Sequence, residues 1–214
     1  MDKPKTVHTK HSFEYEVLRA RLEIRDFFLK NLFREIYENI GQVLSLARIL
    51  LAKHHTEIDQ ASQLVGKSIR DLRDLSKAFY PDADIMKEDG FNQGLKTAVA
   101  IIFPGHTAPI NIKWVKDVQD PRLKLILFNL VLGIAESLKE LNNELSGLTI
   151  TFTKTTFKIV LSYTGQAILL EEALASDYIT KKMSWQQKAG LVNAKFEQQK
   201  NGSGIVQLKL LPLN

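Results

Sequence analysis

The feature that most constrains this chain is a run of regularly spaced apolar residues in its first quarter. Their spacings alternate between four and three residues, which makes a narrow stripe along a helix of the kind used in helix bundles: Leu29, Phe33, Ile36, Ile40, Val43, Ala47 and Leu50. Helix-compatible sequence extends back to Phe13, so the predicted helix has some 40 residues and a length of ~60 Å. A chain of this size cannot cover such a rod by itself.

A second stripe follows a break at His54-His55-Thr56. Thr56 is suited to cap a new helix that runs to about Phe79 and stops before Pro81. The second stripe has the same spacing and consists of Ile58, Ala61, Val65, Ser68, Leu72, Leu75 and Phe79. Two striped helices joined by a short turn predict an antiparallel hairpin.

The predicted hairpin has more apolar surface than two helices can bury. Beside the stripes it carries the flanking residues Leu32, Leu44, Leu46, Leu51, Leu64 and Ile69. Pairing two hairpins into a four-helix bundle would bury the stripes and the flanks together, which predicts a homodimer. The alternative is that the stripes pack on the C-terminal part of the same chain.

The rest of the chain mixes helical and strand patterns. After a polar linker, we predict helices at 91–103, 120–145 and 177–188, and strands at 110–115, 148–153, 157–162, 192–196 and 205–211. Helices covering one face of a mixed sheet are expected. The predicted domains are a helical hairpin dimerisation domain (1–80), a linker (81–90) and an α/β domain (91–214).

Composition excludes several classes of function. The chain has no cysteine, which excludes disulfides, Cys-ligated zinc and thiol catalysis. Its net charge of +5 is spread along the chain, so no nucleic-acid partner is predicted. The N-terminus has no apolar signal core, and the longest apolar stretch, Leu123–Leu138, is interrupted by polar residues. We therefore expect a cytoplasmic protein without a membrane segment. The pair His54-His55 is interpreted as solvated, and no metal site is predicted.

Five stretches, in order, resemble the core of sensor histidine kinases. Arg34–Leu44 resembles the phosphoacceptor helix, most closely that of the nitrate-response-type subfamily, whose pattern has Arg, two residues, His-Asp/Glu, two residues and Gly-Gln. The others are Ile69–Ser76 with Tyr80-Pro81, Asp89–Leu95, Leu127–Leu138 and Gly202–Leu213. The resemblance covers roughly residues 15–214. It implies an α+β protein, with a dimeric four-helix bundle and a two-layer α/β sandwich of the histidine kinase (GHKL) ATPase type.

At the phosphoacceptor position of that resemblance stands Tyr37 in place of the histidine nucleophile. The neighbouring acid is retained as Glu38. Gly41, four residues after Tyr37, leaves room beside Tyr37. Because a phenol is a poor substitute for an imidazole in attack on the γ-phosphoryl group, no residue is predicted to be catalytic. Tyr37 is interpreted as a surface residue, with tyrosine phosphorylation as the alternative.

The nucleotide motifs are degenerate as well. Glu136 matches the family's Glu, but the Mg²⁺-binding Asn is replaced by Glu140. The adenine-binding Asp is replaced by Tyr163, and Gly165 is what remains of its Gly-rich motif. The closing motif keeps Gly202 and Gly204. If Ala189-Gly190 matches the family's Gly-Gly before its last hairpin, the apolar segment 166–176 leaves no room for a phosphate-binding lid. The alternative alignment matches Gly190-Leu191 to the lid's Gly-Leu but leaves the last strands short by a hairpin. The family's cofactors are ATP and Mg²⁺, and this chain is predicted to bind no cofactor and no metal.

The function predicted from these departures is a catalytically inactive, dimeric pseudokinase or interaction module of two-component signalling. Its implied partners are a second copy and a response regulator or histidine kinase. Two alternatives remain: a histidine-phosphotransferase-type relay protein and a residual sensor kinase. Relay proteins of this architecture keep a histidine on the first helix, whereas this helix has none between His11 and His54.

Overall fold

The computed structural model describes residues 4–52, 58–78, 85, 87–105, 107–115, 120–153, 156–166, 184–202 and 204–212. Contacts divide the chain into two compact units. One is Ile24–Ala83, and the other joins Met1–Glu23 to Asp84–Asn214. This grouping differs from the predicted 1–80 segment, because the first 23 residues belong with the α/β part. The division into functional domains stays a prediction.

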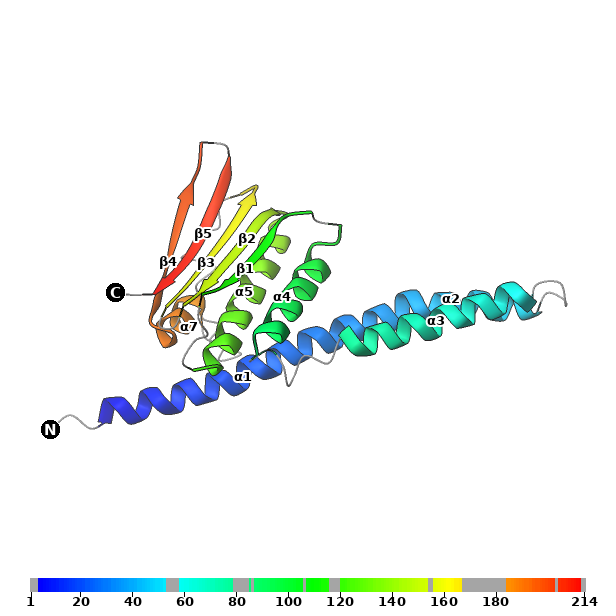
Figure 1. Cartoon of the computed structure of the whole chain (residues 1–214), viewed down its shortest axis with the longest axis horizontal. Coiled ribbons are helices and arrows are strands. Elements are labelled where there is room, and N and C mark those ends of the chain that lie inside the picture. The colour runs from blue at the N-terminus through cyan, green and yellow to red at the C-terminus, as the bar shows by residue number, and fades with distance from the viewer. Residues whose placement is uncertain are drawn as a thin grey trace. The chain divides into compact units, whose positions relative to one another are not determined.

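The smaller unit is a helical hairpin. The first helical stretch consists of α1 (Pro4–Glu35), one π-helical turn η1 (Ile36–Ile40) and α2 (Gly41–Ala52), and α3 (Ile58–Ala78) packs against α2 (Figure 1). The predicted antiparallel hairpin is confirmed. The predicted turn and cap at His54-His55-Thr56 and the helix end at Phe79 lie outside the described residues.

The central residues of the two apolar stripes form the inner contact of this hairpin. Ile40, Ala47 and Ala61 are buried. Ser68, a polar member of the second stripe, is buried as well. The flanking residues Leu44, Leu46, Leu51 and Ile69 remain about half exposed: 41%, 48%, 56% and 52%. A single hairpin therefore covers the centre of its stripes and leaves much of its apolar flank in water.

The larger unit is a two-layer α/β sandwich. Its sheet has the strand order β1-β2-β3-β5-β4, with β1 (Ile110–Trp114) parallel to β2 and the other pairs antiparallel. The remaining strands are β2 (Glu144–Phe152), β3 (Phe157–Thr164), β4 (Ala194–Lys200) and β5 (Ile205–Pro212). The helices α4 (Glu88–Ile102), α5 (Arg122–Glu140) and α7 (Trp185–Leu191) cover one face (Figure 1). The predicted α+β class and mixed sheet are confirmed.

Some predicted boundaries are wrong. The helix expected to reach Leu145 ends at Glu140, because Asn142 takes a left-handed conformation (φ 54°) and the amide of Asn143 donates to Leu138 at 2.9 Å. The chain then enters β2 at Glu144, four residues before the predicted strand. The helix predicted at 91–103 begins at Glu88. The strand predicted at 192–196 is β4, which begins at Ala194. Most of the helix predicted at 177–188 lies outside the described residues.

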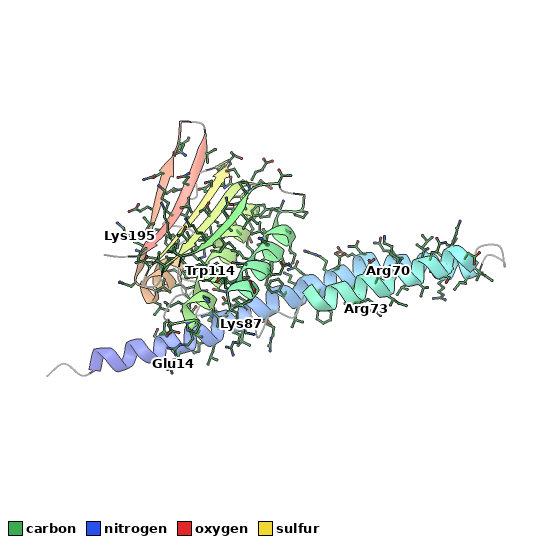
Figure 2. The ribbon with its side chains drawn as sticks, in the orientation of Figure 1. Glu14, Arg70, Arg73, Lys87, Trp114 and Lys195 are labelled. Carbon is green, nitrogen blue, oxygen red and sulfur yellow. The ribbon has the colours of Figure 1, made fainter. Side chains whose placement is uncertain are left out.

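An aromatic cluster joins the helices to the sheet at β1. The ring of Phe91 meets those of Phe128 and Phe152 edge to face, at 5.7 and 5.3 Å between centroids. Trp114, which is labelled in Figure 2, stacks on Phe152 at 4.1 Å, and the buried ammonium of Lys124 lies 4.7 Å from its ring centroid. Trp114 is therefore a packing residue. Every helix among the described residues is too short or too polar to cross a bilayer.

Candidate functional site

The phosphoacceptor-equivalent position lies in the one π-helical turn of the described residues. In η1 the amide of Gly41 donates to the carbonyl of Ile36, five residues back, so the helix bulges there. Tyr37 is 84% exposed and Glu38 is exposed, whereas Ile40 is buried. The phenol therefore points into solvent. A Cβ added at Gly41 would meet the Ile36 oxygen at 3.5 Å, an ordinary contact, so an alanine would fit there.

The two acidic positions of the first nucleotide motif are on α5. Glu136 and Glu140 are both exposed, and Glu140 is the last residue of the helix. Within the described part of the chain, no group of three His, Asp or Glu side chains is placed to hold a metal ion. The carboxylate of Glu140 thus adds negative charge at the end of α5 without a neighbouring cluster of metal ligands.

Tyr163, at the position of the adenine-binding aspartate, is fully buried on β3. Alternate residues of β3 are buried, and Tyr163 belongs to the buried set. Its hydroxyl oxygen accepts a hydrogen bond of 2.7 Å from the side-chain amide of Gln198 on β4. The phenol ring therefore fills the core beside β4, and its polar end is already engaged by the protein.

Gly165 lies two residues after Tyr163, and the conformation and packing at this position require glycine. Its φ is +126°, and an added Cβ would lie 2.1 Å from Oδ1 of Asn143. The Asn143 side chain accepts from the amide of Gln166 at 2.6 Å and donates to its carbonyl at 2.9 Å. Asn143 is buried and ties the end of β3 to the segment after α5. Sequence reasoning assigned no role to Asn143, although an Asn-Asn pair after a helix is a turn signal.

The closing glycines lie in the β4–β5 turn. Gly204 has a φ of +80°, and nothing lies within 4 Å of a Cβ added at Gly202 or Gly204. The register Thr164↔Ile205 and Thr164↔Glu144 brings this turn, the end of β3 and the start of β2 to one end of the sheet. The fold thus gathers the degenerate nucleotide positions at that end, apart from Glu136, which lies one turn earlier on α5. Tyr37 and Glu38 belong to the other unit.

A nearby pocket contains none of the predicted site residues. Its volume is about 750 Å³, and its charged lining residues are Lys139 and Glu144. The other lining residues come from the end of α4, the approach to β1 and the segment between α5 and β2. The hydroxyl of Ser146 in its wall is buried without a hydrogen-bond partner among the described residues. The pocket has one charge of each sign, which favours no particular class of ligand.

A buried ion cluster, which sequence reasoning missed, holds the first part of α1 on the α/β unit. Lys188 of α7 is 7% exposed, and its ammonium lies 3.2 Å from Glu23 and 3.4 Å from Glu16. It also donates to the side-chain oxygen of Asn129 on α5. The Asn129 amide donates to Glu23 at 2.9 Å, and Arg19 contacts the same carboxylate at 3.0 Å. Residues more than 100 positions apart thus share one cation.

The two carboxylates of this cluster differ in how well they are satisfied. Burial alone would raise the pKa of Glu23, but the Lys188 charge and hydrogen bonds from Asn129, Lys188 and Arg19 hold that pKa below its ordinary value. Glu16 is fully buried, and neither of its oxygens accepts a hydrogen bond within the described residues. The ammonium of Lys188 lies 3.4 Å from this carboxylate and balances its charge, so the cluster depends on that lysine.

Comparisons with known proteins found likenesses among solved structures. No family model and no curated protein matches the chain. A blue-light-activated histidine kinase from Erythrobacter litoralis is 11% identical, with 85% of this chain matched to 60% of that one at a TM-score of 0.43. A bacterial phosphotransferase is 12% identical, with 88% of this chain matched to 96% of that one at a TM-score of 0.40.

A third similar structure is the histidine kinase ThkA in complex with the response regulator protein TrrA. It is 15% identical, with 94% of this chain matched to 66% of that one at a TM-score of 0.30. The cytoplasmic segment of the histidine kinase QseC is also similar. Histidine kinase cores, the class that the sequence motifs resemble, are thus among the solved structures to which this chain is similar in fold.

Proposed function

We propose that this protein is a histidine-kinase-like dimer that no longer transfers phosphate and acts by binding a signalling partner. The observation that carries this proposal is the burial and hydrogen bonding of Tyr163. At the position where the family uses a carboxylate to bind adenine, this chain has a fully buried phenol whose hydroxyl is bonded to Gln198. A nucleotide would have to displace a core side chain and break that hydrogen bond.

The residues around Tyr163 support the same conclusion. Gly165 accommodates the Asn143 clamp, so its glycine has a role without any nucleotide. Glu140 would bring a carboxylate next to a triphosphate, which repels it unless a metal ion intervenes. The residues present therefore do not fit ATP and Mg²⁺, and we derive no phosphoryl-transfer step through them.

The phosphoacceptor helix supports binding in place of catalysis. Tyr37 is presented to solvent at a π-helical turn, four residues after the exposed Phe33. An exposed aromatic pair at this spacing makes a small apolar surface on the helix. We propose that this flank binds a response regulator or a histidine kinase. The step from surface to partner rests on the sequence resemblance, which is an analogy.

We further propose that two hairpins pair into a four-helix bundle. The half-exposed flanking side chains Leu44, Leu46, Leu51 and Ile69 support this pairing. Full burial of an exposed Leu or Ile is worth roughly 1.5–3 kcal/mol, so each half-exposed residue would contribute about 1 kcal/mol. In a single hairpin these side chains stay in contact with water, so their burial does not contribute to stability. Light scattering at micromolar concentration should give about twice the 24.3 kDa chain mass.

Nucleotide binding and phosphorylation test the proposal directly. Calorimetric titration of Mg·ATP into the whole chain should give no affinity tighter than roughly millimolar, about −4 kcal/mol. Incubation with labelled ATP should leave the chain unlabelled, and so should the variant Tyr37→His, because the nucleotide site is also lost. An active histidine kinase serves as the positive control.

The two alternatives predict different results. Micromolar Mg·ATP binding, or labelling of Tyr37→His, would establish a residual kinase and overturn the reading of Glu140 and Tyr163. Acceptance of a phosphoryl group from a phosphorylated response regulator by the unmodified chain would establish a relay protein. Absence of all three activities, together with a dimer mass, supports the binding role.

A further inference from the structure

The turn between β4 and β5 carries the dipeptide Asn201-Gly202, in which an asparagine precedes a glycine. Every other asparagine that has a following residue is followed by one with a side chain. Because glycine has no Cβ, its backbone nitrogen can be approached more closely than that of any other residue, and its backbone angles are the least restricted. The dipeptide therefore places a side-chain carboxamide beside an unshielded backbone amide.

The turn leaves both of these groups unengaged. The amide of Asn201 donates to the carbonyl of Ile205 at 2.8 Å, and the amide of Gly204 donates to the carbonyl of Asn201 at 3.1 Å. These two bonds close the turn without the Gly202 amide or the Asn201 carboxamide, neither of which is hydrogen-bonded to another described residue. Asn201 and Gly202 are exposed, and nothing lies within 4 Å of a Cβ added at Gly202. The two groups can thus meet without breaking either bond of the turn.

We propose that Asn201 is a site of spontaneous deamidation, with water as the co-reactant. The Gly202 nitrogen gives its proton to the solvent and attacks Cγ of Asn201. A carbon–nitrogen bond forms, and the side-chain nitrogen leaves as ammonia, which closes a five-membered succinimide. Water then opens this ring at either carbonyl and leaves aspartate or isoaspartate. One water is consumed and one ammonia is released, and no group is oxidised or reduced. The inference is independent of the proposed binding function.

The products change the charge and the length of the turn. Either product adds a carboxylate at the end of the sheet that also carries Glu144. Isoaspartate in addition lengthens the main chain by one methylene carbon, because the chain then runs through the former side chain. The bond from Gly204 to the Asn201 carbonyl spans this part of the turn. The isoaspartate form should therefore pair β4 with β5 less well than the natural chain does.

Incubation of the whole natural chain in mildly alkaline buffer made with heavy-oxygen water tests the proposal. Peptide mass spectrometry should find a carboxylate that carries the heavy oxygen at Asn201, increasing with time and faster at higher pH, because the attacking nitrogen must lose its proton. Asn193 is the internal control: it is exposed too, but Ala194 follows it. The urea-unfolded chain shows that the method detects the reaction. Conversion of Asn193 as fast as Asn201, or of Asn201 in the unfolded chain only, would overturn the proposal.

The variant Gly202→Ala tests the attacking atom. Its new Cβ has open space, so the turn should fold as before. The methyl group hinders the approach of the backbone nitrogen and restricts the backbone angles, so conversion of Asn201 should slow roughly tenfold or more. An unchanged rate would show that water attacks the carboxamide directly, and would reject the succinimide route.

The variant Asn201→Asp separates the effect of charge from that of chain length. It has the new carboxylate without the extra carbon, so its urea unfolding midpoint should stay close to that of the natural chain. The isoaspartate form, purified by ion exchange from aged protein, should unfold at a lower urea concentration than Asn201→Asp. Equal midpoints for the two would contradict the predicted loss of pairing between β4 and β5.

Discussion

Removal of the Lys188 charge should release the first part of α1 from the α/β unit. In Lys188→Met the apolar stem is kept, but the ammonium that lies 3.2 Å from Glu23 and 3.4 Å from Glu16 is lost. Two carboxylates then share this site, where Arg19 still contacts Glu23 at 3.0 Å. Removing one partner of a buried ion pair typically costs about 3–5 kcal/mol.

The matched control is Lys195→Met on β4 (Figure 2). Lys195 makes an exposed ion pair with Glu197 at 3.0 Å, and exposed pairs contribute about 0–1 kcal/mol. Urea unfolding of the whole chain, followed by the fluorescence of its two tryptophans, Trp114 and Trp185, should show a loss of several kcal/mol for Lys188→Met. The control should show less than about 1 kcal/mol. Equal, small losses in the two variants would refute the importance of the cluster.

The pH dependence adds a test of sign. The folded-state pKa of Glu23 is lowered, so its contribution to stability is fully present above the unfolded-state value and is lost as pH falls through the folded-state pKa. Lys188→Met removes the largest of the interactions that lower this pKa. The stability difference between the natural chain and Lys188→Met should therefore be largest near neutral pH and shrink below about pH 4.5. A difference that grows in acid would contradict this account.

Three further tests, two of them with a control variant, address other parts of the structure. Gly165→Ala should destabilise the α/β unit by about 2 kcal/mol or more, because the new Cβ would lie 2.1 Å from the Asn143 side chain and the φ of this residue is +126°. The control Gly202→Ala has open space around the new Cβ and should change the unfolding midpoint little. Tyr163→Phe should cost about 1 kcal/mol in chemical denaturation through the lost bond to Gln198, and a stabilising effect would contradict that contact. Leu44→Asp with Ile69→Asp should convert the dimer to a folded monomer in light scattering with helical circular dichroism retained; in contrast, Ile40→Asp should unfold the hairpin because Ile40 is buried within it.

The hairpin could be predicted from the sequence because its determinants are local. Helical spacing at Leu29–Leu50 and Ile58–Phe79 fixes which faces meet, and the structure buries Ile40, Ala47 and Ala61 accordingly. The strands and the mixed sheet followed from alternation and turn residues for the same reason. Boundaries such as the end of α5 failed because Asn142 and Asn143 stop that helix through conformation and hydrogen bonds, which apolar periodicity does not report.

The sequence by itself determined which chemical groups stand at the motif positions. Tyr37, Glu140 and Tyr163 stand at the positions to which the resemblance assigns functional groups, whatever the fold does with them. Only the tertiary structure decided that Tyr163 is a core residue bonded to Gln198 and that Gly165 accommodates Asn143. It also decided that Lys188 joins Glu16, Glu23 and Asn129. The physical reason is that these contacts link residues 22 to 172 positions apart, and a one-dimensional pattern does not encode which distant side chains share a buried charge.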